Sequence, residues 1–403
     1  MDLTRIQVII MLALVLTLFF TSGYTASAVS EGLLSVRGTW IVNPIGRVVF
    51  LRGTNYPGYE RAVTPEVHSE SAYELFARVG FNVVRLPISW SKLEPAPGKF
   101  SESYLTSYVD RDIRWAKKYG LYLILDMHQS NWGARFGGSG VPDWVVNKYP
   151  PTDAGMRRAV SDFWNQIELQ DHLVNVWRNV ARRYANETTI AGYDILNEPW
   201  IYTSIVANLN ASYVNDFYVR VIKSIRTVDP NHIIFLEPSN MYPTDFPLRE
   251  NIVWSPHFYT LSFAAVYHQS GVGLLEADIS AKYQKFVVEM ESPMWIGEFG
   301  AFMNDGSSQQ WLRDALRVFN KYQIGWAWWA FDSRDGRIPS ALYITWANQR
   351  TTAEAETTEL EMRNLETYLV LAVALEVAFI GVLALSVWLK RRQGSGLSRR
   401  RYR

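Results

Sequence analysis

The sequence predicts an α/β protein built as a (β/α)8 TIM barrel, with an N-terminal β-hairpin plug and a C-terminal transmembrane helix. Three observations lead to this prediction. Short runs of β-forming apolar residues alternate with amphipathic stretches, which is typical of parallel βα units. Eight such runs can be marked, the number that closes a barrel of this kind. Near the C-terminus, the stretch Tyr368–Leu389 is almost free of charge.

The predicted strands are runs of five to eight residues rich in Val, Ile, Leu and aromatic side chains. Between them, apolar residues recur every three or four positions, the period of an amphipathic helix. A further strand near Leu33–Val42 turns through Asn43–Gly46, so we expect a hairpin with the first barrel strand that plugs the bottom of the barrel. The predicted barrel strands are Val48–Asn55, Asn82–Ile88, Tyr122–Met127, Gly192–Leu196, Ile233–Glu237, Ile252–His257, Met294–Glu298 and Gly325–Phe331, and the clearest helices are Tyr104–Tyr119, Val174–Tyr184, Tyr213–Thr227 and Trp311–Tyr322.

Composition limits the classes of protein that the chain can be. Hydrophobic residues make up 48% and charged residues 20% of the 403 residues, so a large core can form. The formal net charge of +1 gives no reason to expect a nucleic-acid partner. The chain has no cysteine, which excludes disulfide bonds, thiol catalysis and cysteine-bound zinc. One large folded domain is therefore expected over residues 29–350.

The N-terminus has the features of a secretory signal peptide. Arg5 precedes an apolar run from Val8 to Phe20 that only Thr17 interrupts. Ala26-Ser27-Ala28 follows with the small residues of a cleavage site. We expect residues 1–28 to be removed on secretion, and a retained signal anchor is the alternative.

The C-terminus has the features of a membrane anchor. Tyr368–Leu389 carries a single charge, at Glu376, and as a helix would be about 33 Å long, enough to cross a bilayer core. The basic tail 390–403 follows the positive-inside rule, which predicts a cytoplasmic tail and an extracellular barrel at the cell membrane. Residues 351–367, rich in Thr and Glu, would link the barrel to the membrane.

Barrel active sites lie at the C-terminal ends of the strands, and in this sequence those positions are polar. Two of them are glutamates, Glu198 after an asparagine and Glu298 after a glycine. Hydrolysis of a glycosidic bond needs one carboxyl group that protonates the leaving oxygen and one carboxylate that attacks the anomeric carbon. The sequence therefore predicts a glycosidase that uses these two glutamates. The other candidate side chains at strand ends are Arg85, His128, Asn197, His257, Tyr259, Trp328 and Trp329.

The strand ends carry motifs that resemble glycoside hydrolase family 5, a family of retaining β-glycosidases. The likeness extends from about Leu33 to Leu342. It implies that Glu198 is the acid/base and Glu298 the nucleophile of a double displacement. The motifs, in the family's order, are Arg85-Leu86-Pro87, Asp126-Met127-His128, Asn197-Glu198-Pro199, Pro256-His257-Phe258-Tyr259, Gly297-Glu298-Phe299-Gly300 and Trp328-Trp329.

The resemblance also implies supporting roles for other residues of these motifs. On the acid/base side, Asn197 would donate to the sugar 2-hydroxyl and His257 would set the environment of the acid/base. On the nucleophile side, Tyr259 would hold and orient the glutamate, and Arg85 and His128 would support it. No metal ion or other cofactor is implied.

Several aromatic residues are candidate sugar contacts. The resemblance implies a tryptophan platform after the eighth strand, which we assign to Trp329 with Trp328 as the alternative. The connection 130–162 is longer than an ordinary loop and is expected to shape substrate choice, and its glycines 137, 138 and 140 could form a hinge or only a flexible spacer. The remaining candidates are Trp132, Trp144, Trp200 and Glu237, of which Glu237 could instead bridge neighbouring strands.

The resemblance implies a β-linked polysaccharide, oligosaccharide or glycolipid as substrate. A cellulase-like endo-β-1,4-glucanase at the cell surface is the first interpretation, and a β-mannanase is an alternative. Asp126-Met127-His128-Gln129 and the stretch Gly140–Trp144 resemble the endoglycoceramidase branch, which acts on glycolipids. Ser130 stands where that branch has an acidic residue.

Two other classes of protein fit the sequence less well. A metal-dependent barrel hydrolase would need a His-x-His pair after the first strand, where this chain has Asn55-Tyr56-Pro57. A surface barrel that binds carbohydrate without cleaving it would not require both glutamates. The sequence therefore favours an enzyme over either alternative.

Overall fold

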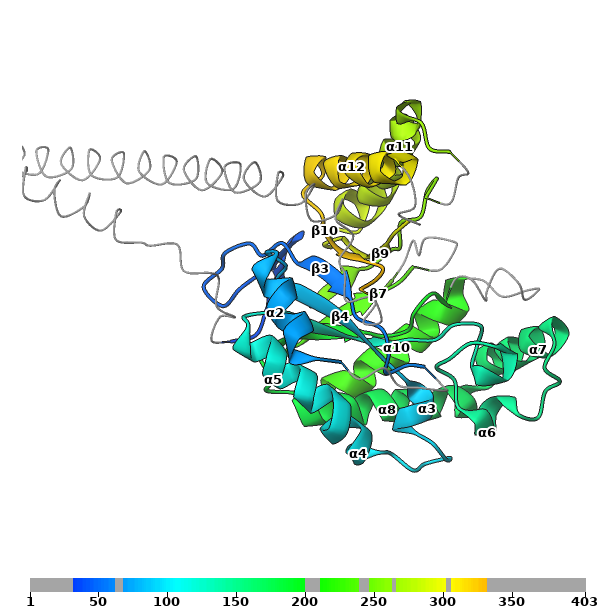
Figure 1. Cartoon of the computed structure of the whole chain (residues 1–403). Helices are drawn as coiled ribbons and strands as arrows, with labels where there is room; N and C mark the ends of the chain where they lie inside the picture. Colours follow the sequence, from blue (N-terminus) through cyan, green and yellow to red (C-terminus); the bar gives the residue numbers. More distant parts are fainter. Residues whose placement is uncertain are drawn as a thin grey trace, which may run out of the picture. The chain divides into compact units, whose positions relative to one another are not determined.

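The computed structural model describes residues 32–61, 68–199, 211–238, 246–262, 266–301 and 306–331. Within these ranges, eight parallel strands form one sheet, and helices lie around it (Figure 1). The barrel strands are β3 (Arg52–Asn55), β4 (Val83–Ile88), β5 (Tyr122–Met127), β6 (Ile190–Asp194), β7 (Ile233–Leu236), β8 (Ile252–Trp254), β9 (Trp295–Phe299) and β10 (Gly325–Trp328).

The sheet closes into a barrel. Its strands are ordered β8-β7-β6-β5-β4-β3-β10-β9, so each strand lies beside its neighbour in the chain and the first strand lies beside the last. The two remaining edges, β8 and β9, are joined by the parallel bridges Trp254 to Met294 and Phe258 to Phe299. The predicted (β/α)8 barrel is therefore confirmed.

Seven of the eight predicted strands differ in their bounds from the observed ones, and only Tyr122–Met127 matches at both ends. The first regular strand is only Arg52–Asn55, and the fourth is Ile190–Asp194 rather than Gly192–Leu196. Beyond Asp194 the chain leaves the regular ladder but still bonds to both neighbours: Ile195 N–H donates to the Phe235 carbonyl at 3.3 Å, and Asn197 N–H to the Met127 carbonyl at 3.1 Å. The irregular backbone begins where the polar site residues begin.

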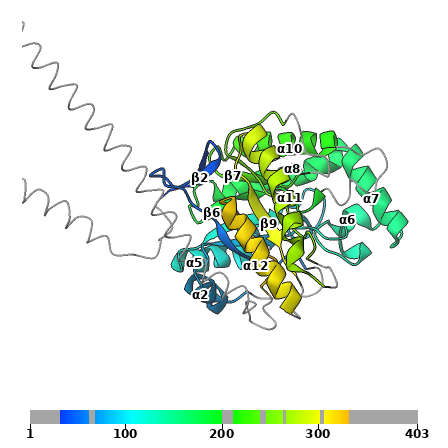
Figure 2. The same cartoon turned by 90° about the horizontal axis from the view of Figure 1, so that it is seen from above.

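Helices connect the strands, and Figure 2 shows several of them around the sheet. Some begin with a side-chain cap that satisfies a free backbone N–H, such as Ser69, which accepts from Ala72 N–H, and Thr152, which accepts from Gly155 N–H. The described helices are α2 (Glu70–Arg78), α3 (Trp90–Leu93), α4 (Glu102–Tyr104), α5 (Asp110–Lys118), α6 (Asp143–Val146), α7 (Asp153–Asn165), α8 (Ile167–Tyr184), α10 (Ala211–Arg226), α11 (Val272–Tyr283) and α12 (Gly306–Lys321).

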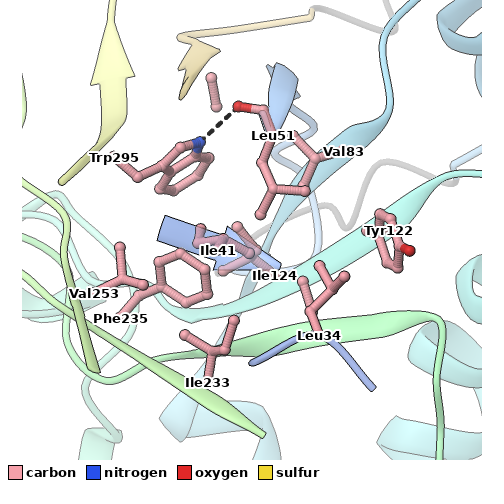
Figure 3. Packing of buried hydrophobic residues seen from close by; sticks show 12 residues of the cluster. Leu34, Ile41, Leu51, Val83, Tyr122, Ile124, Ile233, Phe235, Val253 and Trp295 are labelled. Atoms are coloured by element: carbon pink, nitrogen blue, oxygen red, sulfur yellow. Dashed lines mark hydrogen bonds between the residues drawn. The ribbon is translucent and has the colours of Figure 1, made fainter. Parts of the chain in front are cut away.

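A small hairpin plugs the barrel, but it forms within the predicted strand Leu33–Val42 rather than between that strand and the first barrel strand. Its antiparallel strands are β1 (Ser35–Arg37) and β2 (Trp40–Val42). The predicted turn at Asn43–Gly46 also forms, and Val49 N–H behind it donates to the Ile41 carbonyl at 2.9 Å. Figure 3 shows Leu34 and Ile41 packed among residues of the barrel strands. These contacts bury the apolar end of the barrel and leave the opposite end for polar side chains.

The predicted terminal segments lie outside the described residues. They are the signal peptide 1–28, the linker 351–367, the transmembrane helix 368–389 and the tail 390–403. Among the helices that the structure describes, none combines the length and the apolar character needed to cross a bilayer. The C-terminal membrane anchor therefore stays a prediction.

Candidate active site

The C-terminal ends of the barrel strands bring the predicted polar residues together. Parallel strands end at the same rim, so residues distant in sequence become neighbours there. The side chains that meet are Arg85 from β4, His128 after β5, Asn197 and Glu198 after β6, Glu237 after β7, His257 and Tyr259 after β8, and Glu298 from β9.

Arg85 lies at the centre of this cluster and is fully buried. Burial alone would lower the pKa of the guanidinium, but the surrounding carboxylates reverse this effect and raise it. Each nitrogen of the planar group faces an oxygen from a different strand end, which fixes these strand ends relative to one another. The partners are Asp194 Oδ2 at 2.9 Å from Nε, Glu298 Oε1 at 2.7 Å and Asn55 Oδ1 at 3.0 Å from Nη1, and Asn197 Oδ1, Glu237 Oε1 and Asp126 Oδ1, each at 3.0 Å from Nη2.

Glu298 is held at both of its carboxylate oxygens. Arg85 Nη1 donates to Oε1 at 2.7 Å, and the Tyr259 hydroxyl donates to Oε2 at 3.0 Å. The residue belongs to strand β9, so its backbone is fixed by the sheet. A buried carboxylate with a set orientation and two donors is well suited to attack a carbon atom of a bound substrate.

Glu198 is held differently. Its backbone has a φ of +48°, which is uncommon for a residue with a side chain. Its N–H donates to Glu237 Oε2 at 2.8 Å, and its Oε1 lies 2.9 Å from His257 Nδ1. Burial raises the pKa of the Glu198 carboxyl, but the hydrogen bond and charge of His257 outweigh burial and hold this pKa below its ordinary value.

The two glutamates are close to each other. One oxygen of Glu198, one oxygen of Glu298 and a ring nitrogen of His257 all lie within 4.8 Å of one another. Retaining glycosidases hold their carboxyl groups about 5 to 5.5 Å apart, whereas inverting enzymes leave room for a water molecule at about 6.5 to 9.5 Å. The spacing has no room for that water and corresponds to the retaining arrangement.

The same three residues have donor atoms at a spacing that a metal ion could use. Burial lowers the pKa of His257, but the carboxylates of Glu237 and Glu298 raise it well above the ordinary value, so the imidazole is protonated. A protonated imidazole has no free lone pair for a metal. The side chains present therefore fit a hydrogen-bonded pair of carboxyl groups better than a metal site.

Trp329 and His128 form an aromatic pair at the rim. Their rings are stacked with centroids 5.1 Å apart and planes 8° apart. His128 Nδ1 lies 2.7 Å from Asp126 Oδ2, and although burial alone would lower the pKa of His128, the Asp126 carboxylate raises it to about 9. The stack holds the Trp329 ring in one orientation at the rim that carries the two glutamates.

Three of the predicted substrate contacts have buried side chains. Trp328 is 3% exposed and packs edge-to-face on Phe299, and Trp132 is 1% exposed and packs edge-to-face on Phe163. Glu237 is 0% exposed and bridges strand ends, which was the alternative prediction for it. Their roles as substrate contacts stay predictions.

The remaining two predicted contacts have different outcomes. Trp144 is partly buried and has structural partners: its Nε1 donates to the Glu94 carbonyl at 3.0 Å, and its ring packs against Trp90 and His172. This packing does not support a sugar platform. Trp200 lies outside the described residues.

The glycines of the long loop allow close packing rather than a hinge. Ser130 and Ser139 form an antiparallel bridge. A Cβ atom on Gly138 would lie 1.8 Å from the Ser130 carbonyl oxygen, and one on Gly140 would lie 2.4 Å from the His128 carbonyl oxygen. A side chain at either position would break the bridge, so the loop is fixed to the end of β5.

The structure adds site residues that the sequence did not single out. Gln129 Nε2 donates to the Asn197 carbonyl at 2.7 Å, and Asn197 Nδ2 donates to the Gln129 carbonyl at 3.1 Å. Asn55 and Asp194 are fully buried partners of Arg85. Their position in the sequence could have identified them, because each is a polar residue at or within an otherwise apolar barrel strand. A polar group buried there needs a hydrogen-bond partner.

A closed (β/α)8 barrel with two adjacent carboxyl groups at its C-terminal rim defines a retaining glycoside hydrolase. A sequence model of one family, Cellulase (glycosyl hydrolase family 5), matches residues 44–335. The chain belongs to glycoside hydrolase family 5.

Curated relatives and a solved structure agree with this assignment. The chain is 27% identical to a β-xylosidase of Phanerodontia chrysosporium over 74% of this chain and 70% of that protein. It is 25% identical to an endoglycoceramidase of Cyanea nozakii over 73% of this chain and 68% of that protein. A crystal structure of an endogalactoceramidase superposes with a TM-score of 0.69 and 26% identity, covering 78% of this chain and 84% of that chain.

The pKa of His128 leads to a prediction about stability and pH. Folding raises this pKa from 6.5 to about 9, so the stabilisation is complete below about pH 6.5 and is lost as the pH rises through 9. His128→Gln removes this contribution. The difference in unfolding free energy between wild type and variant should be larger at pH 6 than at pH 9.5 by at most about 3 kcal/mol. Urea unfolding followed by tryptophan fluorescence measures it, and a difference that does not change with pH would contradict the assignment.

Proposed function

We propose that this enzyme hydrolyses the β-glycosidic bond of a glycolipid, with Glu298 as nucleophile and Glu198 as acid/base. The observation that carries the catalytic roles is the contrast between the two carboxyl groups. Glu298 has a donor on each oxygen and a strand backbone. Glu198 Oε1 lies 2.9 Å from His257 Nδ1, and Glu198 is the more exposed side chain, at 19% against 5%.

In the first step, a Glu298 oxygen bonds to the anomeric carbon while Glu198 gives its proton to the departing oxygen. The carbon–oxygen bond to the aglycone breaks, and a glycosyl ester of Glu298 remains. In the second step, Glu198 takes a proton from water, whose oxygen attacks the same carbon and releases Glu298. Two inversions give net retention. Arg85 and Tyr259 hold Glu298 on the line of attack throughout.

Glu198 must be protonated in the first step, yet His257 holds its pKa low. A bound sugar ring would cover the exposed part of Glu198 and exclude water from it. Removal of water favours the neutral carboxyl group, so substrate binding opposes the effect of His257. This balance allows Glu198 to be an acid when the leaving group is present and a base afterwards.

Two observations support a glycolipid substrate. The endogalactoceramidase structure superposes over 84% of its length, so most of its fold has a counterpart here. Val266 and Leu274 are 57% and 59% exposed on the segment that leads from the end of β8 into α11. That segment starts at the rim that holds the carboxylates, where exposed apolar side chains suit a substrate with a lipid part.

A soluble β-glucan is the second candidate substrate. The matching family is described as Cellulase, which favours an endo-β-1,4-glucanase. Trp329 at the rim, held by its stack on His128, provides the flat apolar face on which a glucose ring can lie. A β-mannan would use the same platform.

The catalytic roles predict different behaviour for the two glutamate variants. Glu298→Ala should lose nearly all turnover, and azide should restore activity with inverted configuration because azide replaces the missing nucleophile. Glu198→Ala should lose about 10²- to 10⁴-fold with poor leaving groups, and azide should give a product of retained configuration. Product configuration is read by proton NMR. Rescue of either variant with the opposite configuration would contradict the assignment.

The substrate proposal is tested with the full chain in detergent on a panel of glycans. The panel holds glucosyl- and lactosylceramide, carboxymethylcellulose, lichenan, glucomannan and xylan, with Glu298→Gln as control. We expect sugar release from a ceramide glycoside that the control lacks, measured by chromatography of the released sugar. Cleavage of carboxymethylcellulose or lichenan without any release from lipid would move the assignment to an endoglucanase, and cleavage of glucomannan alone to a mannanase.

We also propose that the enzyme is anchored at the cell membrane. Residues 1–28 would direct secretion, 29–350 form the catalytic domain, 351–367 link it to a transmembrane helix at 368–389, and the basic residues 390–403 stay in the cytoplasm. The apolar run and the flanking positive charges support this arrangement. It would place the barrel on the side of the membrane where glycolipid headgroups are accessible.

Cell fractionation tests the anchor. The full chain should be found in the membrane fraction, and added protease should remove the barrel from intact cells. A chain that ends at Leu365 should instead be released into the medium with its activity retained, because it lacks the apolar span. Recovery of the full chain in the soluble fraction would contradict the proposal.

A further inference from the structure

Glu237 is a buried carboxylate that the two-step mechanism does not use. It follows strand β7 and is 0% exposed. The Tyr218 hydroxyl donates to its backbone carbonyl at 2.9 Å, which holds the residue in place from helix α10. Burial of a carboxylate is costly, so the groups around it must offset that cost.

Each oxygen of Glu237 accepts from a different part of the site. Oε2 accepts from the Glu198 backbone N–H at 2.8 Å. Oε1 accepts from Arg85 Nη2 at 3.0 Å and lies 3.1 Å from His257 Nε2. The other ring nitrogen of His257 lies 2.9 Å from the Glu198 carboxylate. Glu237 therefore contacts Glu198 twice, directly at its backbone and through His257 at its side chain.

The backbone contact stabilises an unfavourable conformation. A φ of +48° at Glu198 places a residue with a side chain in the left-handed region, a conformation that such residues rarely adopt. The hydrogen bond to Glu237 is formed by the N–H of that same residue. A hydrogen bond to a carboxylate is stronger than one between neutral groups, so this contact offsets the backbone strain.

The contact with His257 fixes which ring nitrogen carries a proton toward Glu198. Glu237 Oε1 lies 3.1 Å from Nε2, and burial, which lowers the pKa of His257, is outweighed by the carboxylates of Glu237 and Glu298, which raise it well above its ordinary value. In the protonated imidazole both ring nitrogens are N–H. The N–H at Nδ1 therefore points at the Glu198 carboxylate.

We propose that Glu237 is a positioning residue for the acid/base: it holds the backbone of Glu198 and, through His257, the orientation and proton affinity of its carboxyl group. This proposal rests on the proposed role of Glu198. The titratable groups that face Glu237 are Arg85 from β4, Asp194 from β6, His257 after β8 and Tyr218 from α10. Those that face the Glu198 carboxyl are His257, His128, Arg85 and Tyr259.

Glu237→Gln changes this arrangement without changing its size. Both oxygens of Glu237 are acceptors, whereas glutamine has one acceptor and one donor. Whichever way the amide is turned, an NH2 group faces either Glu198 N–H or Arg85 Nη2. His257 loses one of the carboxylates that raise its pKa, so its positive charge beside Glu198 is weakened and the pKa of Glu198 rises.

The experiment compares two leaving groups on the sugar that the wild-type enzyme cleaves best. A phenyl glycoside needs the proton from the acid/base, whereas a 2,4-dinitrophenyl glycoside leaves without it. For Glu237→Gln we expect kcat/KM to fall at least about tenfold more with phenyl than with dinitrophenyl, and the basic limb of the phenyl pH profile to move to higher pH. Glu237→Asp, which keeps the charge but is too short to reach both partners, should show the same preference if the glutamine variant does not fold.

Asp194→Asn is the matched control. Asp194 is equally buried and accepts from Arg85 Nε at 2.9 Å, but among the described residues it has no hydrogen bond to Glu198 or His257. It should lower kcat/KM for both glycosides by a similar factor and leave the pH limb in place. An equal loss for both glycosides in Glu237→Gln and Glu237→Asp, as in the control, would overturn the proposal. A wild-type enzyme that cleaves no aryl β-glycoside would instead overturn the proposed function.

Discussion

The site depends on one buried guanidinium. Arg85 bonds to residues from β3, β5, β6, β7 and β9, so a single planar group sets the distances between most of the strand ends. Four carboxylates surround it, which is more negative charge than it can balance. The protonated imidazoles of His128 and His257 supply the remainder. At Asp194 and Glu237 these positive charges do not outweigh the effect of burial, so the pKa of each carboxyl group is raised.

The two glutamates differ because their backbones differ. Glu298 lies inside β9, where strand pairing and two side-chain donors leave it a single orientation. Glu198 lies four residues beyond the end of β6, on irregular backbone with a positive φ, and its carboxylate faces the partly open side. A nucleophile needs a fixed line of attack, and a proton donor needs a protonation state that can change. The ends of β6 and β9 bring these two carboxyl groups within 4.8 Å of each other.

Residue position in the barrel could be predicted from the sequence, and residue exposure could not. Strand ends follow from hydrophobic periodicity, and the parallel fold then brings Arg85, Glu198, His257 and Glu298 to one rim. The burial of Trp132 has a physical cause: a loop of this length needs its own core, and Trp132 packs into it against Phe163. The alternation of side chains in β10 likewise turns Trp328 to Phe299, whereas Trp329 after the strand reaches His128.

Closure of the barrel and assembly of the site are the same structural event. The sheet has its seam between β8 and β9, where regular pairing is replaced by isolated bridges. One of these bridges includes the hydrogen bond from Phe258 N–H to the Glu298 carbonyl at 2.8 Å. The next residue, Tyr259, then reaches the Glu298 carboxylate across the seam, and the preceding residue, His257, reaches Glu198. A barrel left open at this seam would separate Glu298 from Tyr259, His257 and Glu198, which all follow strands on the other side of it. The fold therefore cannot be completed without bringing the reacting carboxyl groups together.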